Sequence, residues 1–273
     1  MMRGEKRRGR DRGDIAVFRY FFTISGLPDG AGFRMFGPGH LLWLAAVAAA
    51  AVFCTVKYRN LSAAGRKKMQ LVFCWSMVEL DLFKDVYFMI TGVFSWEFLP
   101  LHLCGMAIYI SLFNVYRPGR VKRELLYSLC MPGAAVALIF PAWTSYPLWN
   151  VATLQCFLIH ALLFIYPILL LSSGEIHPEA RNLPLCLLFL LAVCPPVYGI
   201  NRLLGTDFMF INYPLPAQPF LLFVRWFGNP GYIFGMLLML LTVWGMLYLP
   251  LALIRRSRSR RRSNSGLTGP LHG

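Results

Sequence analysis

Charge and paired cysteines are both scarce in this chain of 273 residues. Only 14% of the residues are charged, whereas 57% are hydrophobic. Because a soluble domain carries roughly a quarter charged residues, a soluble globular fold is excluded. The seven cysteines contain no CxxC pair, which removes support for a disulfide framework or a zinc site. Each cysteine is therefore interpreted by default as a small buried hydrophobe.

Signals for export, repetition and metal binding are also missing. The basic N-terminal run leads into residues 15–27, which are too short and too interrupted for the apolar core of a cleavable signal peptide. The aromatic residues there instead predict an interfacial stretch at the lipid headgroups. No internal repeat is visible. His40, His102 and His160 lie on different apolar blocks without i, i+4 pairing, so we expect no metal site, and we expect no other cofactor.

Long apolar blocks are what the chain does contain. They predict transmembrane helices at roughly 40–56, 70–92, 101–116, 125–143, 151–172, 183–203 and 232–254. The predicted fold class is an all-α, polytopic membrane helical bundle of about seven transmembrane helices. We expect a basic N-terminal tail with an interfacial segment (1–35), a transmembrane domain (36–254) and a basic disordered C-terminal tail (255–273). The protein is thus predicted to be a multi-pass integral membrane protein, of the cell membrane if the source is bacterial.

Basic residues mark one side of the predicted bundle. The connections after the first, third, fifth and seventh blocks carry Lys or Arg, whereas those after the second and fourth carry none. The positive-inside rule therefore predicts the N-terminus outside and the C-terminus in the cytoplasm. With so hydrophobic a body, the basic tails are expected to bind anionic lipid headgroups and not nucleic acid. The proline-rich loop 204–231 is expected to form an ordered outer cap.

Ionisable residues inside a predicted span are functional candidates, because burying them in lipid is costly unless they are paired or hydrated. Asp81, Lys84 and Asp85 are spaced i, i+3 and i+4, so they share one helix face. They either form a self-neutralising cluster that packs the bundle or line a hydrophilic cavity. Glu79 lies roughly opposite that face and would need a partner of its own.

A cysteine and a histidine lie at the same predicted depth. Cys104 and His160 each precede the cytoplasmic end of their span by thirteen residues. At ~1.5 Å per residue, both lie about 20 Å from that boundary. Asp81 shares the level, as does the sequence Cys194-Pro195-Pro196, which is expected to break the sixth helix. The coincidence predicts a site within the membrane.

Three motifs resemble one family of membrane proteins. The run Leu99-Pro100-Leu101-His102-Leu103-Cys104, with Pro100 expected at the first helical position, is similar to a signature of the YwaF-type integral membrane proteins of bacteria. Phe36-Gly37-Pro38-Gly39-His40-Leu41 also looks like that family. So does Gly205-Thr206-Asp207-Phe208-Met209-Phe210-Ile211, although asparagine is expected where this chain has Asp207. The family is related to the eukaryotic transmembrane protein 164, a multi-span ether-lipid acyltransferase.

The resemblance implies acyl transfer between membrane phospholipids. It implies that Cys104 is the nucleophile, which forms a thioester, and that His160 on another span is the base. Glu79, Asp81 and His102 are the candidates for orienting that histidine, and His102 is also a candidate for binding a headgroup. The expected supporting residues are His102, Glu79, Asp81, Lys84, Asp85, His40 and Asn201.

Three other functions stay open at this stage. The same Cys104–His160 pair with water as the acceptor would make a phospholipid hydrolase. Buried charges beside a broken helix are also typical of proton-coupled transporters and lipid-handling proteins, although such carriers usually show an inverted repeat. A structural or assembly protein, whose polar residues only lock the bundle, is the third.

Overall fold

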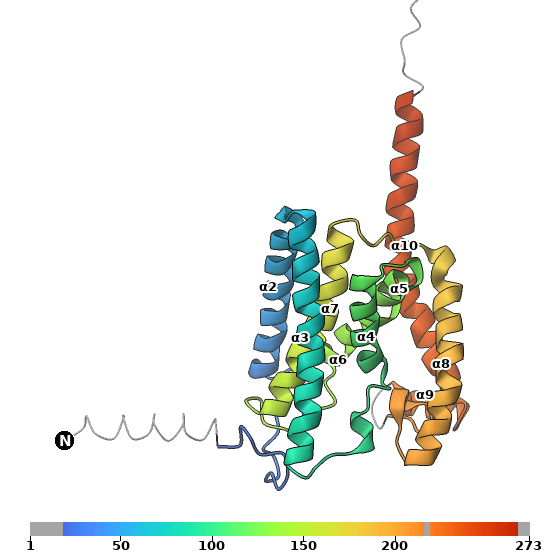
Figure 1. The fold of residues 1–273 in the computed structure, drawn as a ribbon. Coiled ribbons are helices and arrows are strands. Elements are labelled where there is room, and N and C mark those ends of the chain that lie inside the picture. The colour runs from blue at the N-terminus through green and yellow to red at the C-terminus, as the bar shows by residue number, and fades with distance from the viewer. Residues whose placement is uncertain (1–18, 216–218, 267–273) are drawn as a thin grey trace, which may run out of the picture. The chain divides into compact units, whose positions relative to one another are not determined.

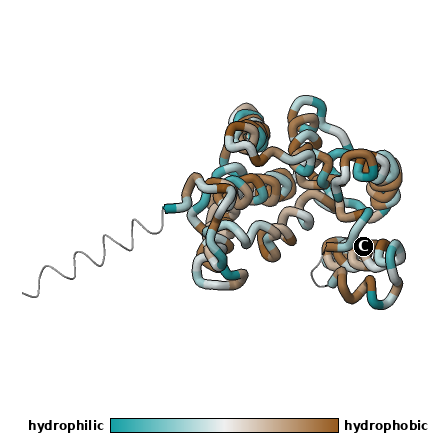
Figure 2. Tube along the Cα trace, turned by 90° about the horizontal axis from the view of Figure 1, so that it is seen from below, coloured by the Kyte–Doolittle hydropathy of each residue, from teal (hydrophilic) through white to brown (hydrophobic). Residues whose placement is uncertain are grey.

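The computed structural model describes residues 19–215 and 219–266, and within these ranges every regular element is helical (Figure 1). The chain divides into two compact units, Met1–His177 and Pro178–Gly273, and each is described by itself. Hydrophobic stretches run along the helices, and hydrophilic residues lie both within helices and in the connections (Figure 2). The predicted all-α fold class is confirmed.

The first unit is a bundle built around α7. Its elements are α2 (Pro38–Asn60), α3 (Ala63–Ile90), the 3-10 turn η1 (Trp96–Phe98), α4 (Leu103–Tyr116), α5 (Arg120–Leu125), the π-helical turn η2 (Leu126–Cys130), α6 (Met131–Ile139) and α7 (Val151–Ser172). Helix α7 contacts α2, α3, α4 and α6. Its Phe157 and Tyr166 are completely buried, as expected for the central member of a bundle.

The second unit continues the helical pattern. Its elements are the 3-10 turn η3 (Ala180–Asn182), α8 (Leu183–Leu204), the 3-10 turn η4 (Phe208–Phe210), α9 (Phe220–Phe227) and α10 (Tyr232–Gly266). Turn η4 and helix α9 fall inside the proline-rich loop 204–231, so that loop carries helical structure of its own. The backbone of α10 stays helical as far as Gly266, into the segment predicted to be a disordered tail.

Five helical stretches of the described ranges are long and apolar enough to cross a membrane: Pro38–Asn60, Trp96–Tyr116, Val151–Ser172, Ala180–Leu204 and Tyr232–Leu253. The protein is accordingly a multi-pass integral membrane protein. Helices also occupy the two other predicted spans. One is α3, which carries many charges, and the other is the α5–η2–α6 segment, which a π-helical turn divides. The count of seven spans and the N-out orientation remain predictions.

The predicted break at Pro195 and Pro196 is wrong, because α8 runs through both prolines. Each proline removes a backbone N–H and with it one hydrogen bond of the helix. In lipid no water competes for the remaining backbone groups, so the other backbone hydrogen bonds of α8 are retained on both sides of the two prolines. The sixth helix therefore does not provide the broken backbone that a transporter site would use.

The start of α2 accounts for one of the family motifs. Pro38 occupies the first helical position, where its missing N–H costs no hydrogen bond. His40 is 1% exposed. Its Nδ1 accepts the backbone N–H of Phe36 at 3.0 Å, and its Nε2 lies 2.9 Å from the carbonyl oxygen of Leu138. Nδ1 therefore fastens the turn before α2, and Nε2 joins α2 to α6, so both ring nitrogens have a structural role.

The described part of the N-terminal segment packs onto the first unit. The Asn150 amide donates to the carbonyl oxygens of Tyr20 and Thr23 at 2.7 and 2.8 Å. The backbone N–H of Val151 donates to the carbonyl of Phe21 at 2.9 Å. Phe22 remains 68% exposed and is available to lipid headgroups. Phe18, the other end of the predicted interfacial stretch, lies outside the described residues.

Candidate functional site: a cysteine at the start of α4

Cys104 is the second residue of α4, which begins at Leu103 with His102 as its N-cap. The first backbone bond of this turn runs from the N–H of Met106 to the carbonyl oxygen of His102, at 3.0 Å. The N–H groups of Leu103, Cys104 and Gly105 have no partner within the described ranges, and they lie at the positive end of the helix dipole. The arrangement offers donors to an oxyanion formed next to the Cys104 sulfur.

Pro100 does not occupy the first helical position, so that prediction is wrong. The N–H of Leu101 bonds to the carbonyl of Leu99 at 2.7 Å, which closes a tight turn. His102 is extended, with φ −67° and ψ 152°, so the helix starts only after it. Cys104 consequently lies within the first turn of α4, nearer to the unpaired N–H groups than the sequence predicts.

Gly105 fixes how closely this turn approaches α4. A Cβ at Gly105 would lie 2.7 Å from the Cα and 2.9 Å from the carbonyl carbon of Pro100, so only glycine fits. The helix has 14 residues, which span ~21 Å against a hydrocarbon core of ~30 Å. It is too short to cross a membrane alone, and it begins beside the middle of α3 and not at its end (Figure 1). The end that carries Cys104 therefore lies within the bundle.

His160 lies on α7, and its ring is held on two sides. Nδ1 is 2.7 Å from the carbonyl oxygen of Cys156, one turn earlier. Because a carbonyl oxygen is only an acceptor, Nδ1 carries the proton of the neutral ring and Nε2 keeps its lone pair. The indole of Trp143 stacks on the imidazole, with ring centroids 5.0 Å apart. The Cys156 carbonyl thus orients His160, in place of the three side chains proposed from the sequence.

The helices of Cys104 and His160 contact each other. Cys156 lies one turn before His160 on α7, and its carbonyl oxygen holds the His160 ring. Among the described residues no hydrogen bond joins the Cys104 thiol to the imidazole. The pairing of Cys104 as nucleophile with His160 as base stays a prediction.

The charged residues of α3 form a closed cluster. The Lys84 ammonium lies 2.8 Å from Asp81 Oδ1 and 3.3 Å from Asp85 Oδ1, so the three do share one face as predicted. It also donates to the carbonyl of Phe98 at 3.2 Å, which ties α3 to the turn before α4. The cavity beside Lys84 measures only about 10 Å³, room for roughly one water. Of the two interpretations, the contacts favour a self-neutralising cluster that packs the bundle.

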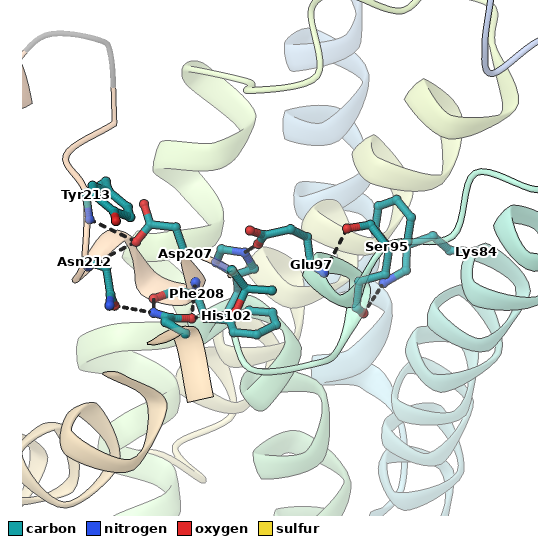
Figure 3. A network of polar contacts seen from close by, with 11 residues as sticks. Lys84, Ser95, Glu97, His102, Asp207, Phe208, Asn212 and Tyr213 are labelled. Atoms are coloured by element: carbon teal, nitrogen blue, oxygen red, sulfur yellow. Dashed lines mark hydrogen bonds and ion pairs between the residues drawn. The ribbon is translucent and has the colours of Figure 1, made fainter. Parts of the chain in front are cut away.

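His102 and Glu79 have different surroundings. His102 Nε2 lies 3.8 Å from Glu97 Oε2, an ion pair when the ring is protonated (Figure 3). The backbone N–H of Glu97 bonds to Ser95 Oγ at 3.3 Å, which caps η1. Glu79 is exposed on α3, away from the Asp81 face as predicted, and has no ion pair or hydrogen bond within the part of the chain that is described.

Asn201, in the second unit, organises the loop that follows α8. Its Nδ2 donates to the carbonyl oxygen of Phe208 at 3.1 Å and to Asn212 Oδ1 at 2.7 Å. Its Oδ1 accepts the Thr206 hydroxyl at 3.0 Å and the backbone N–H of Phe208 at 2.8 Å. With 2% exposure and four bonds within the loop, this amide has a structural role.

Asp207 completes the same loop. Its Oδ1 accepts the backbone N–H groups of Asn212 and Tyr213 at 3.1 and 3.2 Å (Figure 3). Burial raises the pKa of the Asp207 carboxyl, and the two backbone bonds partly offset that rise. The asparagine expected at this position would offer the same acceptor without the charge.

Sequence reasoning missed three residues around the cysteine and the histidine: Cys156, Trp143 and Gly105. Two of them had a signal. Cys156 precedes His160 by one helical turn, and Gly105 directly follows the six-residue motif. The stacking of Trp143 on His160 depends on the path of the connection between α6 and α7, which the local sequence does not specify.

The fold and site define an all-helical, multi-pass membrane protein with a cysteine at the start of a short helix inside the bundle. The chain belongs to the TMEM164 family, whose model matches residues 35–248. The predicted relationship to transmembrane protein 164 is thereby confirmed. The matched range includes Cys104, His160 and all three motifs. Neither the curated proteins nor the solved structures yield a significant match.

Proposed function

We propose that this protein is an integral-membrane acyltransferase that moves an acyl chain between phospholipids through a thioester on Cys104. The observation that carries the proposal is the position of Cys104 at the start of α4, among three backbone N–H groups that have no partner in residues 19–215 and 219–266. The helix that carries His160 packs against it. A nucleophile, a base and oxyanion donors are the three parts that acyl transfer requires.

The first half-reaction would form the thioester. His160 Nε2 takes the thiol proton as the Cys104 sulfur attacks the ester carbonyl of a donor phospholipid. The carbonyl oxygen becomes an oxyanion, which the N–H groups of residues 103–105 stabilise. The carbon–oxygen bond of the ester then breaks, the acyl group stays on sulfur, and the leaving lysophospholipid oxygen takes the proton back from His160.

The second half-reaction reverses these roles. The hydroxyl of an acceptor lysophospholipid gives its proton to His160 Nε2 and attacks the thioester carbonyl. The carbon–sulfur bond breaks, and the proton returns to the Cys104 thiolate. Both lipids reach a site among the helices laterally from the membrane. Nδ1 stays bonded to the Cys156 carbonyl throughout, which keeps the reactive lone pair on Nε2.

The test is an acyl-transfer assay on the purified protein in lipid nanodiscs. A phospholipid labelled in its acyl chain serves as donor and a lysophospholipid as acceptor, and the labelled products are separated by chromatography. We expect label on the acceptor with the wild type and with Cys54→Ala, a half-buried cysteine of α2 that serves as control. We expect Cys104→Ala and His160→Ala to lose it by at least ~100-fold, the usual size of a general-base effect.

Other products would give other answers. Label found only as free fatty acid, and lost in the same two variants, would make the protein a hydrolase that uses the same residues. Transfer that survives in Cys104→Ala would contradict the proposal, because no thioester on that residue would then be required.

A further inference from the structure

A second site lies at the basic end of the first unit, where the start of α3, the end of α4 and the start of α5 meet. A pocket of about 310 Å³ opens there. Residues that line it and bear on the argument are Arg66, Lys67, Gln70, Asn114, Arg123 and Glu175. The volume is that of a small ligand site, and three of its nine lining residues are cationic against one carboxylate.

The carboxylate in the pocket is already fully engaged. Glu175 accepts the Tyr58 hydroxyl at 2.7 Å, the Gln70 amide at 2.8 Å and the Ser173 hydroxyl at 3.1 Å. Arg66 approaches the same carboxylate at 3.8 Å. Arg66 balances the charge of Glu175, and Lys67 and Arg123 form no ion pair with a carboxylate in the part of the chain that the structure describes.

Two buried donors of the residues that line the pocket have no acceptor. Arg123 Nε and Arg66 Nε are both buried without a hydrogen-bond partner in the described part of the chain. Lys67 contacts the ring of Tyr116, with its ammonium 5.8 Å from the centroid, and pairs with no carboxylate within the same ranges. Buried donors left unpaired are costly, so the arrangement is that of a site that expects an anion.

We propose that this pocket binds a phosphate group. Two guanidinium groups and an ammonium converge on one cavity, and the planar fork of arginine matches the oxygens of a phosphate with paired, charge-assisted hydrogen bonds. Asn114 also lines the pocket, and its buried Oδ1 has no hydrogen-bond partner within the described ranges. The phosphate belongs either to a lipid headgroup at the helix ends or to a soluble phosphate compound.

This site is separate from the acyl-transfer site proposed above. Asn114 is ten residues beyond Cys104 on α4, which places the pocket ~15 Å farther along the helix. A phospholipid held by its phosphate in the pocket would carry its ester carbonyls well short of the Cys104 sulfur. The bound phosphate is therefore not that of the lipid being cleaved, and the inference does not rest on the proposed function.

The experiment measures binding to the full-length protein by its thermal unfolding, followed by tryptophan fluorescence. One arm titrates inorganic phosphate in detergent against chloride at equal ionic strength. The other arm compares nanodiscs of phosphatidylcholine with nanodiscs that contain phosphatidic acid. Arg123→Gln and Lys67→Gln each remove one charge from the pocket. Arg117→Gln removes one from the exposed end of α4, outside the pocket, and is the matched control.

We expect saturable stabilisation of the wild type by at least one probe. The dissociation constant should rise at least ~10-fold in Arg123→Gln and several-fold in Lys67→Gln, and it should stay within about twofold in Arg117→Gln. Stabilisation by phosphatidic acid alone assigns the pocket to a lipid headgroup, whereas stabilisation by inorganic phosphate assigns it to a soluble compound. Stabilisation by neither probe, or an equal loss in Arg117→Gln and the pocket variants, would overturn the proposal.

Discussion

The close contact between Gly105 and Pro100 makes a quantitative prediction about the start of α4. In Gly105→Ala the new Cβ would meet the Cα of Pro100 at 2.7 Å, against 3.4 Å or more for an ordinary contact. The Cα of Pro100 is a backbone atom, and the position of the new Cβ is fixed by the backbone of residue 105. The turn that contains Pro100 must therefore move. Overpacking of this kind costs about 1–3 kcal/mol, and the higher helix propensity of alanine returns only about 1 kcal/mol. We expect a net loss of about 1 kcal/mol in unfolding free energy.

Gly133→Ala is the matched control. Gly133 also lies in a helix of the first unit, but its Cβ would meet only the Leu103 side chain, at an ordinary 3.7 Å. At Gly133 no close contact offsets the higher helix propensity of alanine, so we expect the unfolding free energy to rise by up to about 1 kcal/mol. Unfolding in mixed detergent micelles, followed by circular dichroism, measures both variants. If Gly105→Ala proved as stable as Gly133→Ala, the close packing of Pro100 on α4 would be refuted.

Three further predictions use the same unfolding assay. Asn201→Ala should lower the unfolding free energy by about 3 kcal/mol, because it removes four buried hydrogen bonds. Asn212→Ala removes only one of these bonds and should lower it by about 1 kcal/mol. Equal losses would argue against Asn201 as the organiser of the loop. The pKa of Asp207 is raised in the folded protein, so ionisation of this carboxyl disfavours folding at pH values above that pKa. The wild type should therefore gain stability relative to Asp207→Asn as the pH falls from 7 toward 4. A stability difference that does not change with pH would contradict this. His40→Phe should lose about 2 kcal/mol, because it strands the buried carbonyl of Leu138, and an unchanged stability would show that this bond is dispensable.

Regular features of the fold could be predicted because they follow from local composition. Helices lie at every predicted apolar block, since a long apolar run in lipid has to satisfy its backbone internally. The shared face of Asp81, Lys84 and Asp85 follows from helix periodicity alone. Cys104 and His160 are candidates from a family motif and from their matching depth; the structure shows that α4 and α7 are in contact, and their catalytic role stays a prediction.

Features that depend on backbone detail or on distant contacts could not be predicted. Pro100 fits the first position of a helix equally well in sequence, but the turn at Leu101 and the extended His102 delay the helix. The Pro195-Pro196 pair looks like a break, yet α8 continues through it because lipid leaves the neighbouring hydrogen bonds intact. The orientation of His160 comes from a backbone carbonyl, and every residue has one, so no residue type in the sequence marks this partner.

The central claim is that Cys104 carries the acyl group, and intact-protein mass spectrometry tests it most directly. The purified protein is incubated with a defined phospholipid and no acceptor, and wild type is compared with Cys104→Ala, His160→Ala and the control Cys54→Ala. We predict an added acyl mass on wild type and on Cys54→Ala that hydroxylamine removes. The mass should be absent from Cys104→Ala and slow to form on His160→Ala. An acyl mass that persists in Cys104→Ala, or none on any variant while Cys104 stays unreactive to a small maleimide near neutral pH, would contradict the account.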